Sequence, residues 1–185
     1  MRKKLFFISV LAWPGLTGAA TAQTLAQADI SQMSIEDLAS VEITTVSKVA
    51  QSLSAAAAPV YVIGHDQILA SGASQVADML RLAPNLEVMQ TNPSHWIVTS
   101  RGLNGNDAAQ NFPNKLLVMI DGRSVYSPLY SGVYWDTLQV LPENIERIEV
   151  VSGPGGTLWG ANAVNGVVNI VTRNTSATQG GMLDL

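Results

Sequence analysis

The stretch that decides the fold is IERIEVVSGPGGTLWGANAVNGVVNIVT, residues 145–172. Its two ends, at 145–151 and 167–172, are rich in β-branched residues and predict strands. Between them, glycines at 153, 155, 156 and 160 tolerate positive φ angles and close backbone approach. Pro154 restricts the residue before it to extended geometry. The stretch therefore predicts two strands joined by a tight, irregular and well-packed connection.

The glycine-rich connection does not have the pattern of a nucleotide-binding loop. A P-loop needs Lys followed by Ser or Thr after its second glycine, whereas Ala161 follows Gly160 here. The dinucleotide pattern Gly-x-Gly-x-x-Gly fails as well, because position 158 is Leu. We therefore expect the connection to serve packing and not phosphate binding.

Upstream of this stretch, shorter patterns predict the rest of the domain. Leu116–Ile120 is continuously apolar, which is typical of a central strand buried on both faces, and Asp121-Gly122 after it predicts a tight hairpin turn. Further strands are expected at residues 60–63, 86–89 and 96–99, and helix N-caps at Asp66 and Ser74. Apolar residues at helical spacing predict the core face of a short helix that ends at Pro84; they are Val76, Met79, Leu80 and Ala83. The whole pattern favours an α+β fold with a small mixed β-sheet, short helices and long loops.

The first 22 residues are typical of a secretory signal peptide. A positive start at Arg2, Lys3 and Lys4 precedes an apolar run and the small-x-small site Ala20-Thr21-Ala22. The run is about 12 residues long, shorter than the roughly 20 that a membrane-spanning helix needs. We expect export and cleavage; the alternatives are an uncleaved anchor and a buried core helix.

Composition narrows the functional classes. Cleavage would remove three of the ten basic residues and none of the fourteen acidic ones, which leaves a net charge of 7 − 14 = −7. Such a chain would repel nucleic acid, and its arginines and lysines are too widely spread to form a basic patch. The sequence has no cysteine, which excludes disulfides and thiolate metal sites. We expect no cofactor and no nucleic-acid partner.

Residues 142–171 resemble the plug domain of TonB-dependent outer-membrane receptors. The matching features are the strand IERIEV, the Gly153-Pro154 turn, the Trp159-Gly160 pair and the closing strand GVVNI at 166–170. Further matches upstream extend the resemblance over residues 60–173: Arg101-Gly102, the strand closed by Asp121-Gly122, and the sequence DMLR at 78–81 followed by Pro84-Asn85.

The resemblance implies a role in transport. In this family the plug fills the pore of an outer-membrane β-barrel, binds substrate on its outer loops, and presents a TonB box to a TonB-type energy-coupling protein. It implies a receptor in the cell outer membrane for active uptake of a scarce nutrient, such as an iron–siderophore complex. Many family members carry Arg where this chain has Ser152, and the resemblance implies that this Arg pairs with acidic groups of the barrel wall. Ser152 cannot supply that charge, so the candidates for barrel contact are Arg101, Glu146 and Arg147.

A TonB-box candidate lies near the start of the resembling region. Its residues are Glu42, Ile43, Thr44, Thr45, Val46 and Ser47. Several are β-branched, which suits an added strand that pairs edge-on with a partner strand through its backbone. The alternative is an ordinary internal strand of the domain.

The loops expected to face outward, at 90–96, 104–114 and 126–135, carry the candidates for ligand contact. These are His95, Trp96, Gln110, Asn111, Tyr130, Tyr134 and Trp135. Aromatic and amide groups together suit sugars, chelated metals or corrinoids. The alternative is that the aromatic side chains belong to the core or contact the barrel.

The sequence gives little support to an enzymatic function. His65 and His95 are the only histidines, neither lies at metal-binding spacing, and no Gly-x-Ser-x-Gly elbow occurs. We therefore expect neither catalytic residues nor a metal site. The charges at Glu146, Arg147 and Glu149 favour cross-strand pairing and barrel contact.

The expected organisation has four parts. Residues 1–22 are the signal peptide, and 23–58 an N-terminal segment with a short helix, the TonB-box candidate and a linker. Residues 59–174 are the plug domain, and 175–185 a tail or the start of a missing barrel. The chain is then a fragment, a relic or a stand-alone plug. The alternative function is a stand-alone soluble periplasmic module that binds or interacts through the plug fold without transport.

Overall fold

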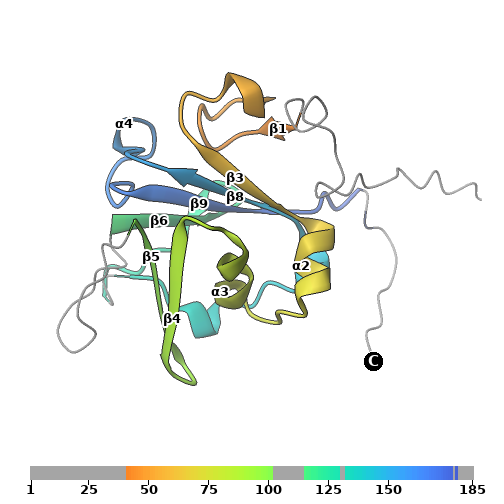
Figure 1. The fold of residues 1–185 in the computed structure, drawn as a ribbon, viewed down its shortest axis with the longest axis vertical. Helices are drawn as coiled ribbons and strands as arrows, with labels where there is room; N and C mark the ends of the chain where they lie inside the picture. The colour runs from red at the N-terminus through yellow and green to blue at the C-terminus, as the bar shows by residue number, and fades with distance from the viewer. Residues whose placement is uncertain (1–40, 102–114, 130–131, 177, 179–185) are drawn as a thin grey trace, which may run out of the picture.

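A five-stranded mixed sheet forms the centre of the molecule. The computed structural model describes residues 41–101, 115–129, 132–176 and 178. Within them the strand order is β3-β8-β9-β6-β7 (Figure 1). β6 and β9 are parallel, and the other neighbours are antiparallel. The strands are β3 (Val60–Gly64), β8 (Ile145–Ser152), β9 (Gly166–Thr172), β6 (Leu116–Ile120) and β7 (Arg123–Ser124). The predicted α+β fold with a small mixed sheet and short helices is confirmed.

The stretch at 145–172 folds as two adjacent strands. β8 and β9 pair antiparallel, with Ile148 opposite Ile170 and Val150 opposite Val168. The glycine-rich connection between them contains a short helix that the sequence did not predict, α4 (Gly156–Trp159). Gly166 opens β9 where a Cβ atom would lie only 2.7 Å from the carbonyl oxygen of Val151. Because that oxygen belongs to β8, the two strands can approach this closely only at a glycine.

Helices and a hairpin cover one face of the sheet. Figure 1 shows α2 (His65–Ser71) and α3 (Val76–Met79) on the same side as the hairpin of β4 (Leu86–Asn92) and β5 (His95–Ser100). Short 3-10 turns complete this layer: η3 (Leu80–Leu82), η5 (Trp135–Thr137) and η6 (Pro142–Asn144). We call its apolar contents the first core. The buried residues that the sheet contributes to it are Ile63, Leu116, Val118, Ile145, Ile148, Val150, Val168 and Ile170.

The four apolar residues at helical spacing belong to this first core, as predicted. Val76, Met79, Leu80 and Ala83 are all fully or almost fully buried. The predicted helix N-caps were wrong. Gly64 caps α2 because β3 runs directly into the helix and the Gly64 N–H donates to Gln67 Oε1 (3.2 Å), so Asp66 lies inside the first turn. For α3 the extended residue before the helix is Gln75 and not Ser74.

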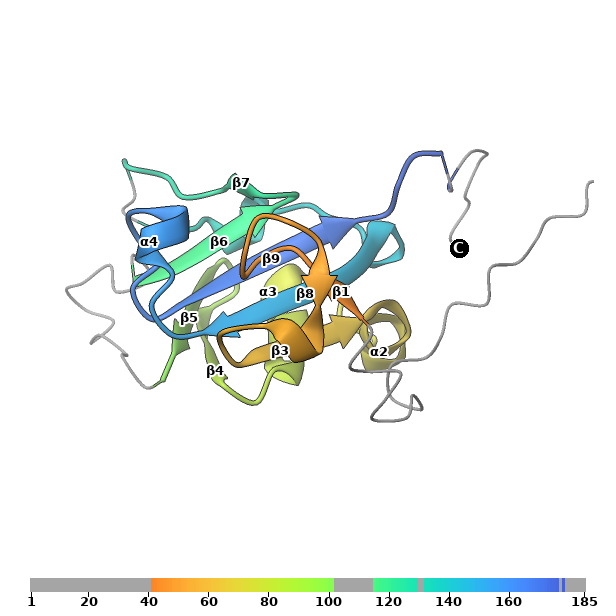
Figure 2. The same ribbon diagram turned by 90° about the horizontal axis from the view of Figure 1, so that it is seen from above.

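The N-terminal segment covers the opposite face. It consists of β1 (Glu42–Ile43), β2 (Gln51–Ser52) and the 3-10 turn η2 (Leu53–Ala55), with β1 and β2 paired antiparallel. Figure 2 shows this segment lying across β8 and β3 when the sheet is seen from above. The second core, between segment and sheet, contains Ile43, Val46, Val62, Leu117, Met119, Val151, Ala163 and Val167. The sheet is therefore buried on both faces by different parts of the chain.

The turn at Asp121-Gly122 is the predicted hairpin. Both residues have positive φ, 49° and 75°, and Ile120 pairs with Arg123 on either side of them. Residues 116–119 are buried on both faces as expected, and Ile120 is half-buried. Among the described strands, the two-residue β7 lies beyond β6 in the sheet. The hairpin thus closes this side of the sheet.

Candidate functional site

The TonB-box candidate is packed against one face of the sheet and is not a free strand. Only Glu42 and Ile43 form β1; the chain then turns, and the Lys48 N–H donates to the Thr44 carbonyl (2.9 Å). Ile43, Thr45 and Val46 are buried, whereas Glu42 is exposed. A partner strand could therefore reach most of this segment only after it leaves the sheet.

Polar contacts hold the middle of the segment. Oε2 of Glu149, on β8, accepts the backbone N–H groups of Thr44 (3.1 Å) and Thr45 (3.0 Å), and it also accepts the Thr45 hydroxyl. The indole Nε1–H of Trp159 donates to the Thr45 carbonyl at 2.7 Å. Lys48 Nζ lies 4.7 Å from the centre of the Trp159 ring, within the range of a cation–π contact. The glycine-rich stretch 145–172 thus supplies both polar anchors of the segment.

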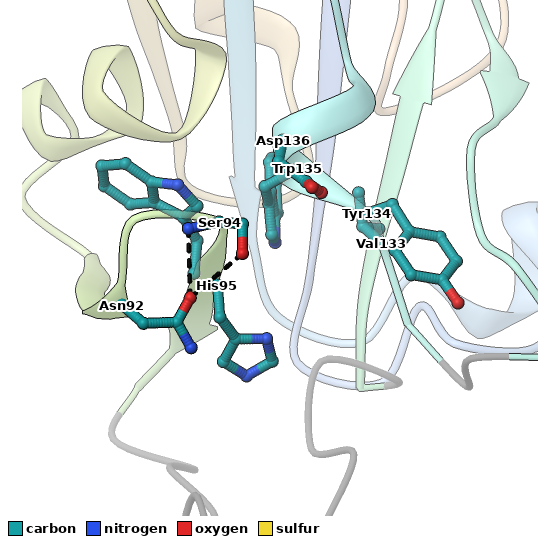
Figure 3. A pocket seen from close by; sticks show the side chains of 8 residues that line it. Asn92, Ser94, His95, Val133, Tyr134, Trp135 and Asp136 are labelled. Carbon is teal, nitrogen blue, oxygen red and sulfur yellow. Dashed lines mark hydrogen bonds between the residues drawn. The ribbon is translucent and has the colours of Figure 1, made fainter.

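A cavity of about 250 Å³ lies on the side of the first core, where the tip of the β4–β5 hairpin meets η5. It is lined by Asn92, Ser94, His95, Trp96, Val133, Tyr134, Trp135 and Asp136. Four predicted ligand residues come together here from the start of β5 and the start of η5: His95, Trp96, Tyr134 and Trp135. Figure 3 shows the indole of Trp135 extending toward the space between His95 and Tyr134.

Two indole N–H groups at this cavity lack partners. Trp96 and Trp135 are 4% and 3% exposed, and within the described residues neither Nε1 atom makes a hydrogen bond. Both side chains belong to the first core, which agrees with the alternative prediction that these aromatic residues are core residues. A buried donor without an acceptor costs free energy. Both nitrogen atoms are closed off from solvent, so an acceptor in the cavity could reach them only after the lining moved.

The tip of the hairpin is shaped by its own polar groups. Asn92 Oδ1 accepts the backbone N–H of Ser94 (3.0 Å) and its hydroxyl (3.1 Å), as the dashed lines in Figure 3 show. The sequence analysis did not single out Asn92, Ser94 or Asp136, because small polar residues at a hairpin are ordinarily assigned to the turn. The remaining predicted ligand residues, Gln110, Asn111 and Tyr130, lie outside the described residues.

The three candidates for barrel contact differ in their surroundings. Arg101 is exposed, and one of its guanidinium nitrogens lies 3.9 Å from where a Cβ of Gly153 would stand. Ser152 next to it is buried, and its hydroxyl accepts a hydrogen bond from the Asn85 amide. Arg147 instead pairs within its own strand, with Glu146 and with Glu149 Oε1 (2.9 Å). Arg101 therefore leaves its guanidinium nearer the surface than Arg147 does.

No group of three or more histidine, aspartate or glutamate side chains in the described part of the chain could hold a metal ion. None of the helices in that part is both long enough and apolar enough to cross a membrane. The expected signal peptide at 1–22 and residues 23–40 of the expected N-terminal segment lie outside the described residues.

The fold agrees with comparisons to known proteins. A family model described as the TonB-dependent Receptor Plug Domain matches residues 52–167. The chain is 26% identical to the ferric yersiniabactin uptake receptor FyuA of Yersinia pestis, whose crystal structure matches with a TM-score of 0.52 over 67% of this chain and 18% of that one. The class is thus the plug of a receptor, and this chain belongs to the TonB-dependent receptor plug domain family.

Curated relatives point to the same class. The ferrienterobactin receptor of Escherichia coli (strain K12) is 30% identical over 193 residues, covering 100% of this chain and 24% of the receptor. The vitamin B12 transporter BtuB of Vibrio vulnificus (strain CMCP6) is 29% identical over 144 residues, covering 77% of this chain and 22% of the transporter. The chain thus spans less than a quarter of the length of these relatives.

Proposed function

We propose that this chain is the gating and ligand-sensing plug of an outer-membrane receptor for active uptake of a scarce nutrient such as an iron–siderophore complex. One observation carries the proposal: a plug-family sheet has the TonB-box candidate docked on one face and an aromatic cavity on the other side. Such a plug would act inside a β-barrel in the outer membrane, with Arg101 as the leading barrel contact, and a TonB-type protein would supply energy. Its role is transport and not catalysis.

The cavity favours a ligand that combines a flat surface with acceptor oxygens. The indole rings of Trp96 and Trp135 contribute apolar surface to its lining. Their N–H groups have no partner among the described residues, and a ligand that moves the lining would gain them as donors. A ferric siderophore has both features, because its organic frame carries the oxygens that surround the iron. The names of the relatives, a ferrienterobactin receptor and a vitamin B12 transporter, support this class of compact chelate.

The ligand proposal predicts a selective effect of Trp135→Phe. Phe retains the apolar ring and removes only the N–H donor, so affinity for ferric enterobactin should fall about fivefold to tenfold, the equivalent of one hydrogen bond. Quenching of tryptophan fluorescence measures the binding. Trp159→Phe is the matched control, since its N–H bonds the Thr45 carbonyl on the opposite face. Equal affinity for both variants would remove Trp135 from the site.

Capture by the coupling protein tests the TonB box. The periplasmic domain of a TonB-type protein should retain the full chain on a resin, and a peptide spanning residues 40–50 should compete. The same peptide with Val46→Pro should compete about tenfold less well, because proline removes a backbone donor and resists strand pairing. A free peptide is the better probe, since it needs no release from the sheet. Undiminished capture of a chain lacking residues 42–47 would contradict the assignment.

A further inference from the structure

Glu149 is a fully buried carboxylate on an apolar face of the sheet. Along β8, Ile148 and Val150 point into the first core, while Glu149 and Val151 face the second core. Glu149 is 0% exposed. A charge in such a place is tolerated only if several donors surround it. The hydrogen-bond donors around Glu149 therefore indicate the role of its carboxylate.

Three of the four donors converge on a single oxygen and come from the N-terminal segment. Oε2 accepts two consecutive backbone N–H groups, those of Thr44 and Thr45, together with the Thr45 hydroxyl. These amides leave the β1 ladder because the chain turns toward the carboxylate directly after Ile43. Hydrogen bonds to a charged acceptor are about twice as strong as neutral ones. The carboxylate thus fixes the segment at its middle.

The fourth donor stays with Glu149 when the segment leaves. Arg147 Nε donates to Oε1 at 2.9 Å, and Arg147 lies two residues earlier in the same strand. Lifting the segment therefore removes only neutral donors, which water replaces, and the carboxylate keeps its cationic partner. Had the cation been on the segment, release would separate a buried ion pair, which is strongly unfavourable. The arrangement holds the segment firmly and still permits reversible opening.

We infer that Glu149 is the latch residue of residues 42–47: it sets the equilibrium between the docked segment and a segment free to be taken by a partner strand. The inference rests on the proposed function for the identity of that partner, but not for the latch itself. Glu149 is a positioning residue, acting through the backbone of Thr44 and Thr45. Trp159 assists by donating to the carbonyl of Thr45, so that the backbone N–H and the backbone C=O of this one residue are both held.

Amide hydrogen exchange on the full chain tests the latch without any partner. Glu149→Gln keeps the shape and removes the charge, so the Thr44 and Thr45 amides should exchange about tenfold faster. Amides of Val150 and Val168, in β8 and β9, should keep their rates, because local opening leaves the sheet intact. Glu146→Gln is the matched control, a neighbouring carboxylate on β8 whose side chain is 46% exposed, and should change neither set.

A second, milder variant keeps the test valid if Glu149→Gln fails to fold. Thr45→Val deletes one hydroxyl donor and leaves the carboxylate and both amides in place; exchange at Thr44 should rise about threefold. Two results overturn the latch: unchanged rates at Thr44 and Thr45, or an equal rise at Val150 and Val168, which would make Glu149 a residue of the general fold. Local opening without capture by the coupling domain would sustain the latch and refute the TonB-box assignment, so the two failures are distinct.

Discussion

Ile148→Ala is expected to lower the free energy of unfolding by about 3–4 kcal/mol, the usual range for removing most of a buried isoleucine side chain without collapse of the cavity. Ile148 is fully buried on β8, the strand between β3 and β9. Its side chain lies in the first core, where the sheet, the helices and the β4–β5 hairpin meet. The cavity could therefore close only if several elements moved together.

Guanidinium denaturation followed by tryptophan fluorescence measures this loss, since Trp96 and Trp135 belong to the same core. Leu158→Ala is the matched control: Leu158 is 42% exposed on α4, and its loss should stay within about 0.5 kcal/mol. A domain of this size is stable by about 5–15 kcal/mol, so Ile148→Ala should leave it folded but much weakened. A loss below about 1 kcal/mol would mean that the first core does not hold the sheet together.

Much of the fold follows from local sequence. The strands at 145–152 and 166–172 are encoded by their β-branched residues, and the Asp121-Gly122 turn by its tolerance of positive φ. The order of the strands does not follow in this way. The parallel pairing of Leu116 with Gly166 joins residues fifty positions apart, and no local preference specifies it. The helix N-caps were misplaced for a related reason, since Gly64 caps α2 only because β3 leads straight into it.

In the candidate site, too, some features could be predicted from local sequence and others could not. Aromatic residues at two loop tips could be recognised from the sequence, and the structure gathers His95, Trp96, Tyr134 and Trp135 around one cavity. The role of Glu149 could not be recognised. In sequence it follows closely after Glu146 and Arg147, as a residue of a solvated, charged strand would. The amide of Thr45 that it binds lies 104 residues away. Contacts between distant segments decide its environment.

The two faces of the sheet differ in how they are closed. The first core draws on α2, α3, β4, β5 and η5, which are threaded between the strands in chain order. The second core is closed largely by residues 41–58, which all precede β3. This segment can lift without breaking any pairing of the five-stranded sheet, because β1 and β2 pair only with each other. The topology thus allows one face to open while the other keeps the domain folded.

Ile43→Ala tests that separation. Ile43 is fully buried in the second core, so the loss of its side chain should weaken docking of the segment by about 2–3 kcal/mol. Exchange of the Thr44 and Thr45 amides should then accelerate by about 30-fold to 150-fold, the corresponding change in the opening equilibrium. Protection of Val168 should fall far less. Ile43→Ala cannot lower the free energy of unfolding by more than the free energy that docks the segment. Once docking is lost completely, the rest of the domain remains folded with the segment released.

The comparison of the two isoleucines decides whether the sheet has one cooperative unit or two. Val49→Ala provides the control within the segment, since Val49 is exposed and its truncation should leave exchange at Thr44 unchanged. If Ile43→Ala accelerates exchange at Val168 as much as at Thr44, the segment unfolds only with the whole domain, and no partner could extract it alone. If the acceleration is confined to residues 42–47, the docking free energy of the second core, together with the Glu149 latch, is what any partner that captures the segment would have to overcome.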